Sequence, residues 1–325
     1  MKKLFLLDAM ALIYRAHFAF SKNPRINSKG LNTGAVLGFA NSLVEILEKE
    51  KPTHIAVAFD TPEPTFRHQA FENYKAQREQ QPEDITVAIP YVMQLLEAFQ
   101  ISILLKTGYE ADDIIGTIAK KSVRQDTDLQ VFMTTMDKDY GQLVEDRIWL
   151  YKPSYLGNDV EILGVPEILA KWEISQISQI TDILGLQGDA VDNIPGIPGI
   201  GEKTAKKLIQ EFGSIENLIQ NVDMLKGKMQ ENVRNFAQQA LLSKQLATID
   251  TNVPIDFQVD SFVYNGFNET KLKALFDELE FRTLAKRLLK NTATQEKEKN
   301  SAEKSSTTET DLFGNTIANK EPQAT

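Results

Sequence analysis

Short apolar runs that end at or near aspartates recur along the first half of this chain and restrict its possible folds. Three runs have this pattern: residues 3–8 end at Asp8, residues 54–59 stop before Asp60, and residues 129–134 precede Asp137 and Asp139. Similar runs without such an ending lie at 101–106 and 147–151, and helical apolar spacing occurs at 34–49, 87–99 and 110–124. This alternation predicts βαβ units and an α/β fold with a twisted, mainly parallel sheet.

Further acidic residues extend this pattern. The complete set has nine members: Asp8, Asp60, Glu110, Asp112, Asp113, Asp137, Asp139, Asp189 and Asp192. Singly, such residues are often turn formers, helix caps or first-turn acids. Together at the carboxyl edge of a parallel sheet, however, they would repel one another unless cations screened them. The set therefore predicts divalent metal ions, which in pairs can activate water for phosphodiester hydrolysis.

Composition narrows the choice of metal. The chain has no cysteine and three histidines, none of them four residues apart, which excludes disulfides, thiolate zinc sites and zinc-protease motifs. Oxygen ligands favour two or three Mg²⁺ or Mn²⁺ ions. An aspartyl-phosphate phosphatase is disfavoured because Met10 stands where its second aspartate is needed. The net charge of −9 is the same as the total charge of these nine acids. If metal ions neutralise them, the charge of the remaining surface is balanced, and local basic patches decide what binds.

The chain divides by composition into three parts. Residues 1–165 have the α/β pattern, with a Pro-rich and charged segment at about 61–90 that is a candidate arch or lid. Residues 166–290 read as helical, and 291–325 are too polar to fold, so we expect a disordered tail. The chain lacks both an apolar stretch near the roughly 20 residues of a membrane span and a signal peptide, which predicts a cytoplasmic protein.

The candidate arch contains a segment, 65–78, with helical spacing. Arg67, Phe71, Tyr74 with Lys75, and Arg78 recur three or four residues apart, which predicts one basic and aromatic face. Such a face suits a nucleic-acid strand, because cations meet phosphates and rings stack on bases. A surface helix that docks its aromatic residues in the core is the alternative, and these residues alone leave both open.

A glycine- and proline-rich string from Ile194 to Ile209 is the most specific pattern in the chain. Its glycines allow a tight turn and close approach to a ligand, and the helix that follows offers free N–H groups to a phosphate. Lys203, Lys206 and Lys207 add positive charge just behind. The string resembles a helix-hairpin-helix motif that holds duplex backbone without reading sequence.

In their order, these motifs resemble the 5′-nuclease domain of bacterial DNA polymerase I, within the flap-endonuclease superfamily. The resemblance runs from Leu4 to about Leu289. It rests on Asp8 with Tyr14-Arg15, Phe59-Asp60, Phe66-Arg67, Tyr74-Lys75-Ala76-Gln77-Arg78, Glu110-Ala111-Asp112-Asp113, Asp137-Lys138-Asp139, and the stretch from Gly188-Asp189 through Thr204-Ala205.

This resemblance implies a PIN-like fold in which all nine acids ligate metal directly or through water. It implies that Lys75 and Arg78 contact the scissile phosphate, supported by Tyr74 and Arg15. DNA contacts are expected from the arch and the hairpin: Phe66, Arg67, Gly196, Gly199, Ile200, Gly201, Lys203, Thr204, Lys206 and Lys207. A potassium ion is expected on the hairpin carbonyls, and the 5′ strand is expected to pass under the arch.

The activity so implied is that of a 5′–3′ exonuclease and 5′-flap endonuclease, for primer removal and repair. Its partners are branched or nicked duplex DNA, RNA–DNA hybrids and a polymerase, fused or separate; no polymerase activity is expected here. Thr310–Gly314 resembles a sliding-clamp-binding peptide. Two alternatives are a catalytically silent module that binds branched DNA and a PIN-like ribonuclease, for which the hairpin has no evident purpose.

Overall fold

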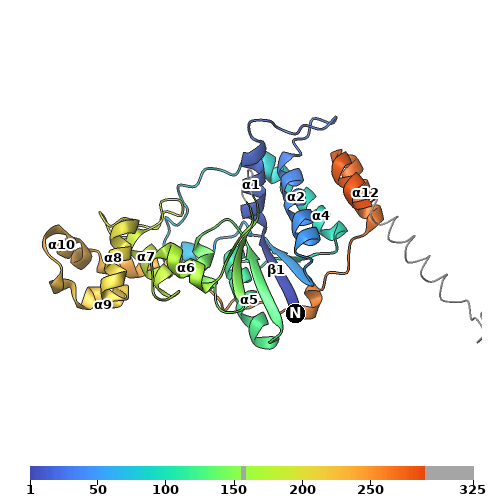
Figure 1. Ribbon diagram of the computed structural model, residues 1–325. Helices are drawn as coiled ribbons and strands as arrows, with labels where there is room; N and C mark the ends of the chain where they lie inside the picture. Colours follow the sequence, from blue (N-terminus) through green and yellow to red (C-terminus); the bar gives the residue numbers. More distant parts are fainter. Residues whose placement is uncertain (155–158, 290–325) are drawn as a thin grey trace, which may run out of the picture. The chain divides into compact units, whose positions relative to one another are not determined.

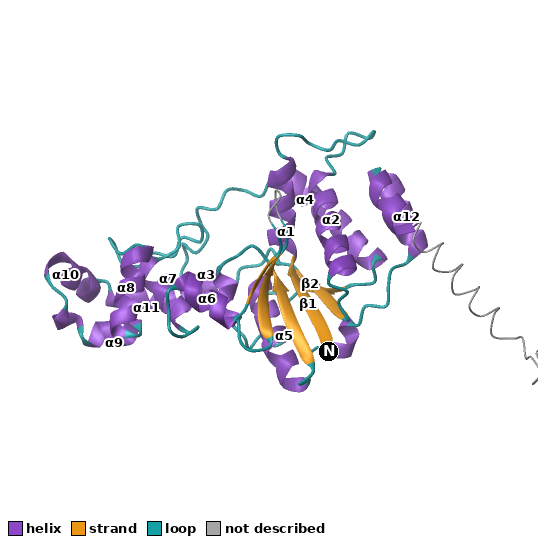
Figure 2. Cartoon of the chain, viewed as in Figure 1, coloured by secondary structure: helices purple, strands orange, loops and turns teal. Residues whose placement is uncertain are grey.

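The computed structural model describes residues 1–154 and 159–289 (Figures 1 and 2). Six strands form one sheet in the order β3-β2-β1-β4-β5-β6. Their bounds are β1 Lys2–Asp8, β2 His54–Ala58, β3 Ser102–Leu104, β4 Leu129–Thr134, β5 Ile148–Lys152 and β6 Glu161–Leu163. The first five strands are parallel and β6 runs antiparallel to β5. The predicted α/β fold with a mainly parallel sheet is confirmed.

The strand register brings the acidic strand ends to one edge. Asp8 is opposite Ala58 in β2, and Leu7 is opposite Thr134 in β4. The residues that follow β2 and β4 therefore leave the sheet beside Asp8. The strand order reverses at β1, between β2 and β4, which is where open α/β sheets form a crevice at their carboxyl ends.

Helices cover both faces of the sheet, because β1 is apolar on both sides. Leu4 and Leu6 join the buried cluster that includes α5 (Ala111–Gln125), whereas Phe5 stacks on Phe132 with ring centroids 4.8 Å apart. Figure 1 shows α5 on one side of the sheet and three helices on the other: α1 Ala9–Phe20, α2 Gly34–Lys49 and α4 Glu83–Ala98.

Helices dominate after the sheet, as predicted. They are α6 Val165–Trp172, α7 Gln179–Gln187, α8 Glu202–Phe212, α9 Ile215–Gln220, α10 Gly227–Asn235 and α11 Ala237–Ala247. Their apolar faces join the same buried cluster as α5, for example through Ile183, Ile209 and Ala240. A second compact unit begins at Glu269 with α12 (Glu269–Leu279).

Two predictions lie outside the described residues: the disordered tail at 291–325 and the clamp-like peptide at Thr310–Gly314. Among the residues that the structure does describe, no helix is both long and apolar enough to cross a membrane.

The candidate arch differs from its prediction. Helix α3 spans only Phe66–Ala70, and Phe71 has extended backbone, so no single helix runs over 65–78. The cause is competition for the backbone: the Lys75 N–H donates to the Asp192 carbonyl at 2.9 Å, and Lys75 has a left-handed φ of 56°. Turns therefore replace the helix from Phe71 onward, and the predicted basic face does not form.

Candidate active site

Asp8 stands at the centre of the carboxyl edge of the sheet and is held by three donors. It caps α1, where its Oδ1 accepts from the Ala11 N–H at 3.0 Å. Its Oδ2 accepts from the Thr135 hydroxyl at 3.0 Å and the Tyr140 hydroxyl at 3.2 Å. The capping role considered from sequence is therefore real, and it also fixes the carboxylate at the strand end.

The start of α5 brings a second group of acids to the same edge. Glu110 is the N-cap of α5, and Asp112 lies in its first turn. The Ala111 N–H donates to Asp60 Oδ1 at 2.8 Å, which ties the start of α5 to the end of β2. Acids from the two strand ends and from the start of α5 thus converge.

A cavity of about 350 Å³ lies at this point, and most of the predicted acids line it. The acids are Asp8, Asp60, Glu110, Asp112, Asp137 and Asp192. Lys75 and Arg78 line the same cavity. Of the other predicted acids, Asp189 accepts from the Val191 N–H at 2.7 Å within its own loop, and Asp139 follows Asp137 closely.

Crowding of these acids shifts their titration. Burial, with Asp60 nearby, raises the pKa of Asp8 to about 7. Burial, with the adjacent Asp113, raises the pKa of Asp112 well above its usual value. Burial, with Asp137 nearby, likewise raises the pKa of Asp139. The charged forms of these groups are therefore poorly compensated by the protein itself.

The cavity suits hard divalent cations by its donor chemistry. The acids that line the cavity offer carboxylate oxygens as ligands. Near them, the buried Oδ1 of Asp139 has no hydrogen-bond partner among the described residues. In residues 1–154 and 159–289 no three acidic or histidine side chains already converge to hold one ion. The fit to a divalent ion therefore rests on the chemistry of the carboxylate oxygens that line the cavity.

Basic side chains from the arch segment partly neutralise the cavity. Lys75 Nζ lies 2.7 Å from Glu110 Oε2, and Arg78 Nε donates to Asp192 Oδ1 at 3.1 Å. The buried Tyr74 donates its hydroxyl to Glu110 Oε2 at 3.2 Å, and burial raises its pKa. These three predicted site residues therefore do lie among the acids.

Four predicted site residues lie elsewhere. Arg67 is 2% exposed and Asp113 is fully buried, and they pair with each other instead of facing DNA or metal. Phe66 lies against Tyr109, with ring centroids 6.0 Å apart, and outside the cavity. Arg15 donates to the Ser42 hydroxyl at 2.6 Å and to main-chain carbonyls after β5. The cations of this group therefore have internal acceptors and the acid has internal donors, while the DNA and metal contacts predicted for all four residues stay predictions.

The loop before the hairpin is closed by tight backbone packing. Gly188 and Gly196 both have positive φ, and a Cβ on either would lie 2.4 Å from backbone atoms of the opposite strand of this loop. Asp189 and Ile194 exchange two main-chain hydrogen bonds, 2.9 and 2.8 Å long. Only glycine fits at 188 and 196, so these two glycines set the shape of the loop that carries Asp189 and Asp192.

The hairpin divides its predicted DNA contacts into exposed and internal groups. Gly199, Gly201, Lys203 and Lys207 are exposed, and Thr204 is partly so. Lys206 pairs with Glu202 at 2.9 Å and Glu173 at 3.1 Å.

Two residues of the predicted hairpin contacts have internal partners or lie in the interior. The Gly196 N–H donates to the Ser243 hydroxyl at 3.0 Å and its carbonyl accepts from Gln239, while Ile200 is 3% exposed. Gly196 and Ile200 therefore support the hairpin from inside, and their contacts with phosphate stay predictions.

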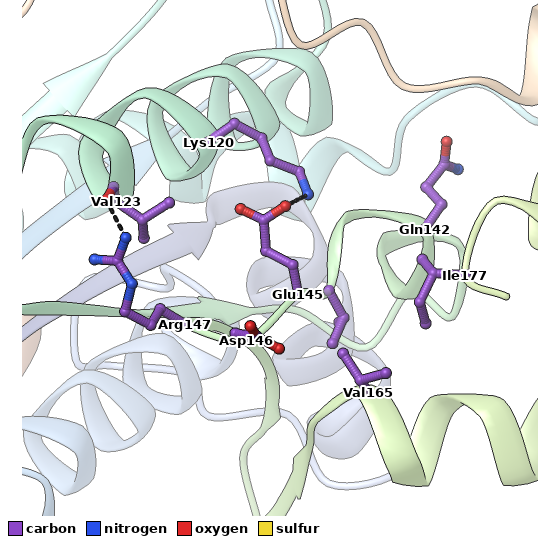
Figure 3. Close-up of a pocket in the computed structure, with 9 residues that line it drawn as sticks. Lys120, Val123, Gln142, Glu145, Asp146, Arg147, Val165 and Ile177 are labelled. Carbon is purple, nitrogen blue, oxygen red and sulfur yellow. Dashed lines mark hydrogen bonds and ion pairs between the residues drawn. The ribbon is translucent and has the colours of Figure 1, made fainter. Parts of the chain in front are cut away.

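A second hollow, of about 520 Å³, lies away from these acids (Figure 3). Its cations have partners within the protein: Lys120 pairs with Glu145, and Arg147 donates to main-chain carbonyls, including that of Asp126 at 2.8 Å. Its size alone does not make it the site, because its cations are compensated internally.

Sequence reasoning missed residues that shape the carboxylate cavity. Thr135 and Tyr140 hold Asp8, and Tyr14, Met10 and Gln81 line the cavity wall. Thr135 and Tyr140 flank the acidic pair at 137 and 139 in the sequence. Hydroxyl residues beside acids that follow a strand were therefore the sequence signal that could have identified these two residues. Nothing in the local sequence distinguishes Gln81.

Comparison with known proteins agrees with this fold. One family model, described as the 5′–3′ exonuclease N-terminal resolvase-like domain, matches residues 3–173. A second, the 5′–3′ exonuclease C-terminal SAM fold, matches residues 175–270. The molecule thus has the architecture of a two-part nuclease.

Relatives in bacteria identify the family more closely. The chain is 41% identical over 299 residues to DNA polymerase I of Bacillus subtilis, covering 91% of this chain and 33% of that protein. It is 37% identical over 302 residues to DNA polymerase I of Streptococcus pneumoniae, covering 88% and 33%. The chain belongs to the 5′–3′ exonuclease family, and it spans about a third of the length of these curated relatives.

Solved structures share the fold at low sequence identity. A bacteriophage T5 5′-exonuclease with bound zinc has a TM-score of 0.65 at 19% identity, covering 86% of this chain and 98% of that one. A T5 flap endonuclease complex with DNA and metal ions has a TM-score of 0.63 at 19% identity, covering 86% and 100%. The catalytic core of Rad2 with DNA substrate has 0.57 at 17%, covering 86% and 88%.

Proposed function

We propose that this chain is a divalent-metal-dependent 5′-nuclease that hydrolyses DNA, and RNA in hybrids, at a 5′ end or a 5′ flap. The observation that carries the proposal is the cavity in which six acids face Lys75 and Arg78. Acids that gather metal and cations that meet a phosphate are what phosphodiester hydrolysis needs, and a nucleophilic Ser or Cys is not required.

The cavity acids, with Asp139 and Asp189 beside them, would hold two or three Mg²⁺ or Mn²⁺ ions. When bound, such ions activate a water and stabilise the leaving oxygen. Lys75 and Arg78 would bind the scissile phosphate, and Tyr74 would keep Glu110 and Asp192 in place through its hydroxyl. The T5 5′-exonuclease with bound zinc and the T5 flap endonuclease complex with DNA and metal ions support this proposal.

The exposed part of the hairpin would hold the downstream duplex. Lys203 and Lys207 supply positive charge. Gly199, Gly201 and Thr204 lie at the start of α8 and offer backbone groups to a ligand. We expect a phosphate on the N–H groups there, or a potassium ion on the carbonyls. We keep the division into an α/β nuclease part, 1–165, and a helical DNA-binding part, 166–290, as part of the proposal.

We propose a role in primer removal and repair beside a polymerase, fused or separate, in the bacterial cytoplasm. The relatives named DNA polymerase I, of which this chain matches one third, support this. A sliding clamp remains a proposed partner through Thr310–Gly314.

The test is incubation of the chain with a labelled 5′-flap duplex and Mg²⁺. We expect cleavage near the junction. Uncut DNA at stoichiometric protein would instead favour a silent module that binds branched DNA. Equal cleavage of single-stranded RNA, without preference for junctions, would favour a PIN-like ribonuclease.

A further inference from the structure

Arg67 and Asp113 form a bidentate ion pair in the interior. Arg67 Nη1 and Nη2 donate to the two carboxylate oxygens of Asp113 at 2.8 Å each. Arg67 is 2% exposed and Asp113 is 0% exposed. Parallel hydrogen bonds of this kind fix both distance and orientation, which a single contact cannot do.

The pair is saturated by further partners from other segments. Arg67 Nε donates to the Leu246 carbonyl and Nη2 to the Thr248 carbonyl, both at 3.0 Å. Asp113 accepts from the Asp250 N–H at 2.8 Å. The pair therefore joins α3 at the base of the arch, the first turn of α5, and the chain that follows α11.

Asp113 also sets the start of α5. Its Oδ2 accepts from the Glu110 N–H at 3.1 Å, which completes the capping box of this helix. The neighbours fixed in this way are Glu110 and Asp112, which line the carboxylate cavity. Lys75 Nζ lies 2.7 Å from Glu110 Oε2, and Arg67 Nη1 lies 3.7 Å from the same oxygen.

We propose that Arg67 and Asp113 are positioning residues: the buried pair aims Glu110 and Asp112 into the cavity and anchors the arch base to the same helix start. Arg67 then does not bind DNA, and Asp113 does not ligate metal. The proposal rests on the proposed nuclease function, but metal binding without DNA tests it separately.

The energetics allow position to be separated from stability. Removing one partner of a buried pair leaves an uncompensated charge and strongly destabilises the fold. Replacing both partners by apolar residues of similar volume is often neutral or stabilising. The double variant Arg67→Met with Asp113→Leu therefore leaves no buried unpaired charge and removes the link to the Glu110 N–H. It also removes the partners of the Leu246 and Thr248 carbonyls and of the Asp250 N–H, which costs some stability.

The experiment measures this double variant by thermal unfolding, by Mg²⁺ titration calorimetry without DNA, and by single-turnover cleavage of a 5′-flap duplex. We expect a melting temperature that is lower than that of the wild type but leaves the protein folded at the assay temperature, Mg²⁺ affinity weaker by about 10–100-fold, and a lower rate with DNA affinity nearly unchanged. Wild-type Mg²⁺ affinity and rate in the folded double variant would overturn the proposal.

A control removes a partly buried pair, Lys244 with Asp182, 2.7 Å apart in the helical part. Lys244→Met with Asp182→Leu should leave Mg²⁺ affinity unchanged; a similar loss there would mean that any destabilisation impairs the site and would overturn the proposal.

Asp113→Asn is a second variant that keeps the side-chain shape and one oxygen to accept from the Glu110 N–H. It leaves the Arg67 guanidinium without its counter-charge and turns an amide NH₂ toward the other donors, so it is less stable than the wild type and is compared at a temperature where it is folded. It should bind Mg²⁺ more tightly than the double variant does; weaker binding would point to a ligand role for Asp113. If wild-type protein binds Mg²⁺ but cuts no flap, the proposed function fails while the calorimetric comparison still decides the role of the pair.

Discussion

Lys75 Nζ contacts Glu110 Oε2 at 2.7 Å, so a cation proposed for the scissile phosphate is paired with an acid proposed for metal. The left-handed backbone at Lys75, φ 56°, and its N–H bond to the Asp192 carbonyl hold it in this position. Divalent ions and Lys75 would therefore compete for Glu110. Metal entry should free Lys75 for the phosphate.

Lys75→Ala and Arg78→Ala should each slow cleavage about 10²–10³-fold while changing DNA affinity much less, because these cations stabilise charge that develops in the transition state. Single-turnover rates and equilibrium binding to the same flap duplex measure the two effects. A loss confined to affinity would mean that the residues only position DNA.

Asp112→Asn and Asp137→Asn should remove Mg²⁺-dependent cleavage and leave duplex binding largely intact, since both line the cavity. Asp146→Asn is the matched control, because Asp146 is an exposed acid in the hollow of Figure 3. It should cut as the wild type does. Undiminished cleavage in both cavity variants would contradict the assignment.

Metal-free stability should decrease as pH rises. The folded-state pKa of Asp8 is about 7 against an ordinary 3.8, so between these values the folded protein binds more protons than the unfolded chain. Each unit of such a shift corresponds to about 1.4 kcal/mol of stability, lost between roughly pH 4 and pH 7. Thermal unfolding with chelator should show this slope, and Asp8→Asn should flatten it.

The same linkage predicts when Mg²⁺ stabilises the protein. Ions bind the ionised carboxylates, so added Mg²⁺ should raise the melting temperature more at pH 8 than at pH 5. An equal rise at both pH values would argue against these acids as the metal site.

Thr135→Val should move the acidic limb of the pH–rate profile to higher pH. The Thr135 hydroxyl stabilises the ionised form of Asp8, so its loss raises the pKa of Asp8 further. Rates of flap cleavage across pH 5–9 measure the shift. The control is Thr181→Val, because Thr181 is a partly exposed residue of α7 whose hydroxyl bonds only to the Ser178 carbonyl, at 3.0 Å.

Lys203→Ala and Lys207→Ala should each weaken duplex binding and reduce the slope of log affinity against log salt by about 1. Lys206→Ala should do less, because Glu202 and Glu173 already neutralise Lys206. Binding titrations over a range of salt concentrations check this order. Equal effects of all three lysines would place Lys206 on the DNA path.

The arch shows where local sequence misleads. Arg67 and Arg78 have the spacing of one helical face, yet Arg67 is buried and Arg78 meets Asp192. The segment contains no residue that forbids a helix. Its conformation depends on acceptors at Asp113 and Asp192, which are distant in sequence, so no local pattern could reveal it.

By itself the sequence determined the sheet and its acidic edge, because strand and helix periodicities are local and parallel strands must share their carboxyl ends. It also indicated the hairpin, since the glycines and prolines from Ile194 to Ile209 favour a tight turn before a helix. Only tertiary structure decided which charges face the cavity. Asp112 lines the cavity and the adjacent Asp113 does not. The reason is that the buried guanidinium of Arg67, from a distant segment, pairs with Asp113, which leaves Asp112 available for the proposed metal.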